Sequence, residues 1–270
     1  MGELTIIGLD IAKSVFQAHG ADAAGSVVFR KKLGRGRLLA FFAGQPRCVV
    51  AMEACAGAHH WGRELEALGH RVKLIPPAYV KPFVKRQKND EADAEAICEA
   101  AQRPTMRFVP VKSREQQASA VVFRARDLLV RQRTQIMNGL RGHLAEFGYV
   151  APKGVMYVER LVAEIEDPES QLPQAARVSL QVMVRMLTAL QTEIASLDAE
   201  IARRSKEDPV ARRLMTIPGI GPITASAMVA LAPGAEAFRC GRDFSAWLGL
   251  TPIQRSSGGK QKLGQITKAG

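Results

Sequence analysis

Four carboxylate residues are the strongest candidates for chemistry in this chain: Asp10, Glu53, Asp90 and Asp93. Asp10 and Glu53 each follow a run of apolar, β-branched residues, so we expect both at strand ends. Asp90 and Asp93 are three residues apart in KNDEADAEA, a helix-forming stretch, which places them on one helix face. Carboxylate oxygens are hard ligands that suit Mg²⁺ or Mn²⁺, and two such ions can promote phosphoryl transfer.

Each of these acids also has an ordinary structural explanation. Asp10 could cap the turn after its strand, and Glu53 could cap the helix that follows it. Asp90 and Asp93 could form a solvated helix N-terminus, where the helix dipole favours acids. The residue types alone therefore leave the metal site as one of two interpretations.

The first 75 residues predict a mixed α/β sheet. Strands are expected at 4–10, 14–20, 26–33, 47–53 and 71–75, with short helices at 37–44 and about 58–68. Three strands in sequence, followed by alternating helix and strand, are typical of such a sheet. Groups beyond its strand ends converge on a shared crevice, which would bring the acids together. We expect His59 and His60 to cap or pack the second helix rather than to act as ligands or bases.

Two long helices are expected in the middle of the chain. One pattern runs from 113 to 147 without proline, and the other covers about 174–204. The second has apolar residues at alternating spacings of three and four, a coiled-coil seam: Leu180, Met183, Leu187, Leu190, Ile194, Leu197 and Ile201. The seam fits an intramolecular hairpin or a dimer interface equally well. We therefore expect three parts, at 1–110, 111–206 and 207–270.

The charge balance favours a polyanionic partner. The formal net charge is +12, and Lys or Arg contacts to phosphates release condensed counterions. Nucleic acid is the first candidate and an anionic membrane surface the second. No run of 18 apolar residues and no signal peptide is present, which argues against a membrane. The four cysteines form no CxxC pair, which fits a reducing cytoplasm and argues against a zinc module.

Basic residues gather beside the acids. Between Arg71 and Lys88 there are six basic residues and no acid, and residues 30–37 add five more. Lys85, Arg86 and Lys88 lead directly into the Asp90 segment. A phosphate backbone held by these residues would pass the carboxylates, although a charged face is often simply solvated.

Two motifs lie in the last section. Residues 214–230 match a helix-hairpin-helix pattern, in which Gly219 and Gly221 would let a DNA backbone approach the amides at a helix start. An ordinary turn between two packed helices is the alternative. Residues 244–270 contain four basic residues and no acid, with Ser256 and Ser257 in a Gly-rich loop. Arg255, Lys260 and Lys262 are further candidate phosphate ligands there.

Three segments together resemble a known family. GLDIAKSVF, VVAMEACAGAHHW and KNDEADAEAI resemble the signature segments of the RuvC-like DEDD domain of insertion-sequence 110 family transposases, and the later segments are closer to its 1111 subgroup. The resemblance implies a ribonuclease-H-like fold, with Asp10, Glu53, Asp90 and Asp93 as ligands for Mg²⁺ or Mn²⁺. It also implies a serine nucleophile that forms a phosphoserine link with DNA. Ser257 matches that position best, and Ser256 remains the alternative.

The same resemblance implies the partners. We expect double-stranded DNA, a structured guide RNA from the element's own end, and a homo-oligomer, a dimer or a tetramer. The expected location is the bacterial cytoplasm, at the nucleoid. Family members continue beyond the point where this sequence ends, with an Asn and a further helix, so we expect a shortened C-terminal domain. The rival functions are a Holliday-junction resolvase, which needs no serine loop, and a DNA-binding remnant without catalysis.

Overall fold

The computed structural model describes residues 3–85 and 89–267, and the chain forms two compact units, Met1–Ala118 and Ser119–Gly270. The division falls near the start of a long helix, α5 (Arg114–Ala145). None of the helices in the described ranges is long and apolar enough to cross a membrane. Each unit is described separately below.

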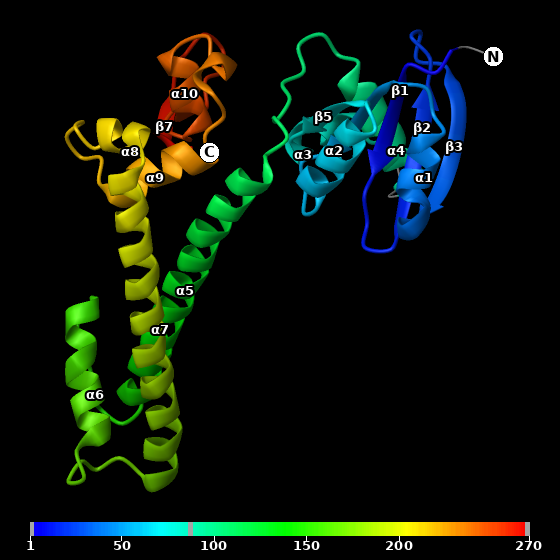
Figure 1. Ribbon diagram of the computed structural model, residues 1–270. Helices are drawn as coiled ribbons and strands as arrows, with labels where there is room; N and C mark the ends of the chain where they lie inside the picture. Colours follow the sequence, from blue (N-terminus) through cyan, green and yellow to red (C-terminus); the bar gives the residue numbers. More distant parts are fainter. Residues whose placement is uncertain (1–2, 86–88, 268–270) are drawn as a thin grey trace. The chain divides into compact units, whose positions relative to one another are not determined.

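A five-stranded mixed sheet forms the centre of the first unit (Figure 1). The strand order is β3-β2-β1-β4-β5; the first three strands pair antiparallel, and β1, β4 and β5 pair parallel. This confirms the mixed α/β sheet that the sequence predicts. The strands are β1 (Ile6–Asp10), β2 (Val15–Ala21), β3 (Val27–Gly34), β4 (Val49–Glu53) and β5 (Arg71–Ile75).

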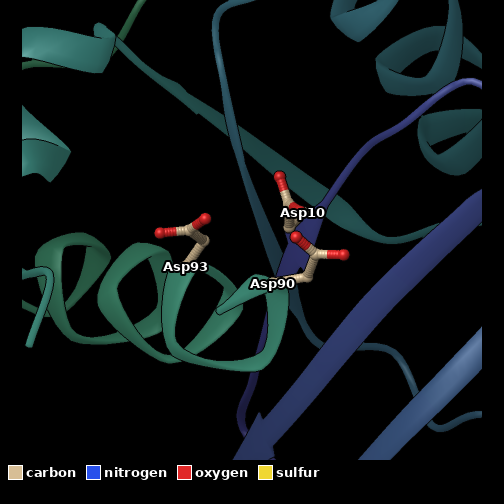
Figure 2. A group of neighbouring side chains, drawn as sticks. All are labelled: Asp10, Asp90 and Asp93. Carbon is tan, nitrogen blue, oxygen red and sulfur yellow. The ribbon is translucent and has the colours of Figure 1, made fainter. Parts of the chain in front are cut away.

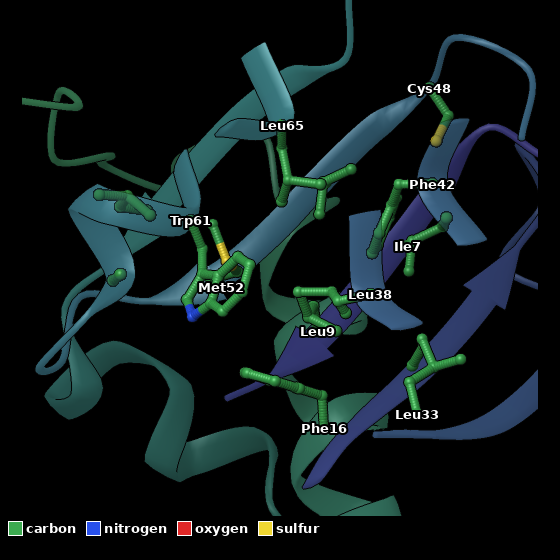
Figure 3. Close-up of a cluster of buried hydrophobic side chains, with 14 residues drawn as sticks. Ile7, Leu9, Phe16, Leu33, Leu38, Phe42, Cys48, Met52, Trp61 and Leu65 are labelled. Atoms are coloured by element: carbon green, nitrogen blue, oxygen red, sulfur yellow. The ribbon is translucent and has the colours of Figure 1, made fainter. Parts of the chain in front are cut away.

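One face of this sheet is covered by two helices, α1 (Leu38–Ala43) and α2 (Ala58–Ala67). Ile7 and Leu9 of β1 pack there with apolar side chains of both helices, among them Trp61 (Figure 3). Because side chains alternate along a strand, the other residues of β1 face the opposite side. The residues that alternate with these apolar positions therefore lie on the second face of the sheet.

The second face is covered by α4 (Asp90–Ala101), with α3 (Pro77–Val80) beside it. Helix α4 lies very close to β1, because Gly8 has no side chain. A Cβ atom built on Gly8 would lie 2.2 Å from the carbonyl oxygen of Ala94 and 2.6 Å from the amide of Cys98. This close contact places the start of α4 beside the end of β1.

The second unit contains a helical hairpin. Helix α5 is followed by α6 (Val158–Glu166) and α7 (Gln174–Glu207), and all three contribute to one apolar core. Leu180 and Leu187 of the predicted seam pack in this core with Leu140 of α5. Further along, Arg126 of α5 makes two hydrogen bonds to the carboxylate of Asp198 of α7. The described contacts therefore place part of the predicted seam in packing within one chain.

The last part of the second unit is built from short elements. Helices α8 (Pro209–Leu214) and α9 (Pro222–Leu231) are joined by a turn in which Gly219 has a φ of +85°. Helix α10 (Gly241–Trp247) follows, and then a two-stranded hairpin of β6 (Pro252–Gln254) and β7 (Leu263–Ile266). The sequence predicts only a flexible loop around the two serines, and the structure instead places them in this hairpin.

Candidate metal centre

Three carboxylates of the first unit lie close together. Asp10 is the last residue of β1, and Asp90 and Asp93 are in the first turn of α4. One carboxylate oxygen from each lies within 4.8 Å of the other two, and Figure 2 shows the three side chains gathered at this point. Asp10 and Asp93 are half-buried, whereas Asp90 is exposed.

The local structure explains why these acids meet. Asn89 caps α4 by accepting a hydrogen bond from the amide of Glu91 at 3.1 Å, so the helix begins at a defined residue. Acids in a first helical turn are favoured by the helix dipole, which partly offsets their repulsion. The close contact at Gly8 then holds this turn against the end of β1. Asp90 and Asp93 thus form the start of a helix, as acids often do, and their carboxylates also lie close to that of Asp10.

Glu53 is not part of this close group. It ends β4, which pairs parallel with β1, so both strands finish at the same edge of the sheet. Burial raises the pKa of its carboxyl, and the negative charges of Asp10 and Asp93 raise it further. Glu53 therefore lies within electrostatic reach of Asp10 and Asp93, and a cation bound there would oppose this rise in its pKa.

The donor set fits a divalent ion. Three carboxylates contribute hard oxygen ligands, and such ions bind carboxylate oxygens at about 2.0–2.6 Å. Neither Asp90 nor Asp93 forms an ion pair with any Lys or Arg in the described ranges, so no described cation neutralises them. An exposed acidic group can also exist without an ion. The three carboxylates are close enough together to share one ion.

The histidines after Glu53 have structural contacts. The Nδ1 atom of His59 accepts a hydrogen bond from the amide of Lys112 at 3.1 Å. His60 lies 3.8 Å from the carboxylate of Glu64, and its ring is tilted against that of Trp61, with the ring centres 4.9 Å apart. Helix α2 itself begins after Gly57 with no side-chain cap, so Glu53 does not cap it. These contacts agree with a packing role for both histidines.

The basic residues of this unit that the sequence predicts as phosphate ligands are only partly described by the structure. The ammonium of Lys85 is hydrogen-bonded to the carboxylate of Glu95, which also pairs with Arg30 at 3.3 Å. This pairing raises the pKa of Lys85, and it lowers that of Glu95. Arg86 and Lys88 lie outside the described residues. Lys85 is therefore already partnered in the free chain, which the sequence pattern did not indicate.

The two serines of the second unit differ in their surroundings. The backbone of Ser257 and Lys260 closes a tight turn over Gly258 and Gly259, whose φ angles are +56° and +76°. The hydroxyl of Ser256 accepts a hydrogen bond from the amide of Lys262 at 3.1 Å. The hydroxyl of Ser257 makes no hydrogen bond with any residue that the structure describes, and both serines are exposed.

The other predicted phosphate ligands of this unit are also exposed: Arg255, Lys260, Lys262, Gly219 and Gly221. Gly221 has an extended backbone, with a φ of −93°, and a Cβ built on it would meet no atom within 4 Å. Neither its conformation nor its packing in the described chain requires a glycine.

The family is shown by comparison with known proteins. A model for DEDD transposases of the IS110 type matches residues 7–148, and one described as the transposase IS116/IS110/IS902 family matches residues 211–270. The chain belongs to this transposase family. The first match contains Asp10, Glu53, Asp90 and Asp93, and the second contains both serines.

Individual transposases are similar over most of their length. A Pseudomonas aeruginosa protein named "Probable family 20 transposase" is 49% identical over 269 residues, which cover 99% of this chain and 80% of that protein. The transposase for insertion sequence element IS1328 of Yersinia enterocolitica is 42% identical, over 100% of this chain and 80% of that protein. The transposase for insertion sequence element IS1111A of Coxiella burnetii is 37% identical, over 100% of this chain and 74% of that protein. The expected resemblance to the 1111 subgroup is thus confirmed, and DEDD domains of this kind imply divalent metal use.

Proposed function

We propose that this transposase cuts and rejoins DNA at a Mg²⁺- or Mn²⁺-dependent site formed by Asp10, Asp90 and Asp93, with Glu53 as a fourth ligand. The observation that carries the proposal is the approach of the three aspartates to within 4.8 Å of one another. Divalent ions held there would promote attack on a phosphate and neutralise charge on the leaving oxygen. The strand order, with three antiparallel strands followed by two parallel ones, supports the ribonuclease-H-like fold for this domain.

Metal titration tests this site. We expect Mn²⁺ to bind the wild-type chain and to lose affinity in Asp10→Asn and Asp93→Asn variants. Glu91→Gln is the matched control, because Glu91 is in the same first turn of α4 but outside the close group. Equal loss in the control would show that Mn²⁺ follows the general negative charge of the helix start rather than this site.

The nucleophile in this proposal is Ser257. The Oγ–P bond to Ser257 forms as the phosphate's bond to one DNA oxygen breaks; the serine loses its proton and the departing DNA oxygen gains one. The hydroxyl of Ser257, at the start of a tight turn, makes no hydrogen bond with any described residue, which supports this choice over Ser256, whose hydroxyl already accepts a backbone hydrogen bond. Exposed cations near the turn, Lys260 among them, would stabilise the charge on the phosphate in the transition state.

A covalent-adduct assay tests the nucleophile. DNA carrying the element's ends is incubated with protein and Mg²⁺, the mixture is denatured, and protein-linked DNA is measured. We expect Ser257→Ala to abolish the adduct and Ser256→Ala to retain it. An adduct that persists in Ser257→Ala and disappears in Ser256→Ala would assign the nucleophile to the neighbouring serine instead.

We also propose that the active assembly is a homo-oligomer guided by a structured RNA. The family membership and the charge of +12 support a nucleic-acid partner. Gly221, directly before α9, is a glycine that neither its conformation nor its packing in the described chain requires, and it supports close approach of a phosphate backbone there. Sequencing the nucleic acid that co-purifies with the chain is the direct test, and a defined RNA is the expected result.

A further inference from the structure

The pairing of the first three strands places three polar residues in one row across the sheet. Asp10 of β1 is opposite Gln17 of β2, and Gln17 is opposite Lys32 of β3. Directly opposed residues on neighbouring strands point to the same face of the sheet. Lys32 therefore shares a face with Asp10, two strands away from it.

This face is the one that α4 covers. In the neighbouring row, Gly8, His19 and Arg30 are opposite one another; Gly8 contacts α4, and Arg30 pairs with Glu95 of α4. Lys32 is two residues from Arg30 and so points to the same side. Lys31, between them, points to the other side, where its ammonium lies 4.9 Å from the centre of the Phe41 ring.

The two basic residues that β3 places on the α4 face have different partners. Arg30 is bound to a carboxylate, and its row lies beside the body of α4. Lys32 is exposed and forms no ion pair with any residue in the described ranges, and its row ends at Asp10. Gln17, half-buried between them, is neutral and can donate and accept hydrogen bonds. A positive charge and an amide thus lie along the sheet surface that leads to the three aspartates.

We propose that Lys32, with Gln17 beside it, binds a backbone phosphate of the DNA strand that enters the aspartate site. The inference rests on the proposed function of that site. Neighbouring strands are about 4.8 Å apart, so the backbone of Lys32 is about 10 Å from that of Asp10. Phosphates along one strand of a duplex advance by about 3.4 Å per nucleotide, which places the contact within about three nucleotides of the cut. The flexible stem of lysine allows its ammonium to follow the backbone.

The test compares Lys32→Gln with Lys31→Gln. The two variants lose the same charge from adjacent positions of one strand, but on opposite faces of the sheet. Binding to a random-sequence DNA duplex is measured with Mg²⁺ over a range of salt concentrations. Loss of one phosphate contact lowers the slope of log K against log salt by about 0.9. We expect this change for Lys32→Gln, the wild-type slope for Lys31→Gln, and restoration by Lys32→Arg.

The outcomes separate this inference from the function on which it rests. A wild-type slope for Lys32→Gln, or an equal fall for Lys31→Gln, overturns the role of Lys32. Mn²⁺ affinity is measured on the same proteins, and we expect it to be unchanged in Lys32→Gln and lost in Asp10→Asn. If Asp10→Asn keeps its affinity for Mn²⁺, the metal site is wrong, and the slopes still decide whether Lys32 binds phosphate.

Discussion

Substituting Gly8 by alanine tests how the fold positions the acids. The new Cβ would lie 2.2 Å from the carbonyl oxygen of Ala94, 2.6 Å from the amide nitrogen of Cys98 and 2.7 Å from its Cβ. Two of these three atoms are backbone atoms of α4, so no side-chain rotation relieves the clash. Ordinary contacts begin at 3.4 Å, so α4 must move away from β1 by about 1.2 Å, the difference between 3.4 and 2.2 Å.

A movement of this size has two separate effects. Overpacking a well-filled interior costs about 1–3 kcal/mol in the free energy of unfolding. The displacement also separates Asp93 from Asp10, whereas the ligands of one metal ion must keep their distances to it within about 0.2 Å. We therefore expect Gly8→Ala to lower both the stability and the affinity for Mn²⁺.

The matched control is Gly20→Ala, in β2. A Cβ at Gly20 would lie 2.4 Å from the ring of Phe29, on the sheet face opposite α4. Both variants are measured by urea unfolding and by Mn²⁺ titration. Gly20→Ala should lose stability and keep its Mn²⁺ affinity, whereas Gly8→Ala should lose both. Wild-type Mn²⁺ affinity in folded Gly8→Ala would show that this contact does not set the geometry of the acids.

Three further predictions concern stability. Burial lowers the pKa of His19 below its ordinary 6.5. As the pH falls below 6.5, the unfolded chain therefore binds a proton at this residue before the folded chain does. The free energy of unfolding should fall with pH in this range. Urea unfolding of His19→Gln at several pH values should lack this part of the fall; an identical pH dependence would refute it. Asp198→Asn removes the partner of Arg126 between α5 and α7 and should cost about 1 kcal/mol by urea unfolding, and no change would mean that the pair adds nothing. Gly142→Ala, in α5 with no atom within 4 Å of the added Cβ, should stabilise by about 0.5–1 kcal/mol, and a loss of stability would indicate an unseen contact.

Strong local patterns made much of the fold predictable. The strand expected at 71–75 has the same bounds in the structure, and the long helices expected at 113–147 and 174–204 differ only at their ends. The strand-end position of Asp10 and the i, i+3 spacing of Asp90 and Asp93 are local properties, so the sequence predicts each of them. That the three aspartates meet depends on the contact of Gly8 with α4, and only the family resemblance implied it. The position of Glu53 outside this group could not be predicted, since it depends on how far β4 lies from the start of α4.

Other features depend on contacts that no local pattern contains. The pairing of Lys85 with Glu95 joins residues on either side of the α4 start, and a count of basic residues cannot reveal it. Helix α6 could have been predicted from the sequence, because its apolar residues Val158, Leu161 and Ile165 have helical spacing. All three are buried in the structure. The β6–β7 hairpin is hard to predict from the sequence, since its strands are short and exposed and one begins with Pro252.

The two outer strands of the sheet are protected from further strand pairing in different ways. Along β5, the amide of Val109 donates a hydrogen bond to the carbonyl of Leu74, so a segment of the same chain already occupies that side. Strand β3 has no such cover in the described chain, but it carries Arg30, Lys31 and Lys32 in succession. Two copies of β3 brought edge to edge would place like charges against one another, which disfavours sheet extension and aggregation. Copies of this chain should therefore associate through surfaces other than this edge.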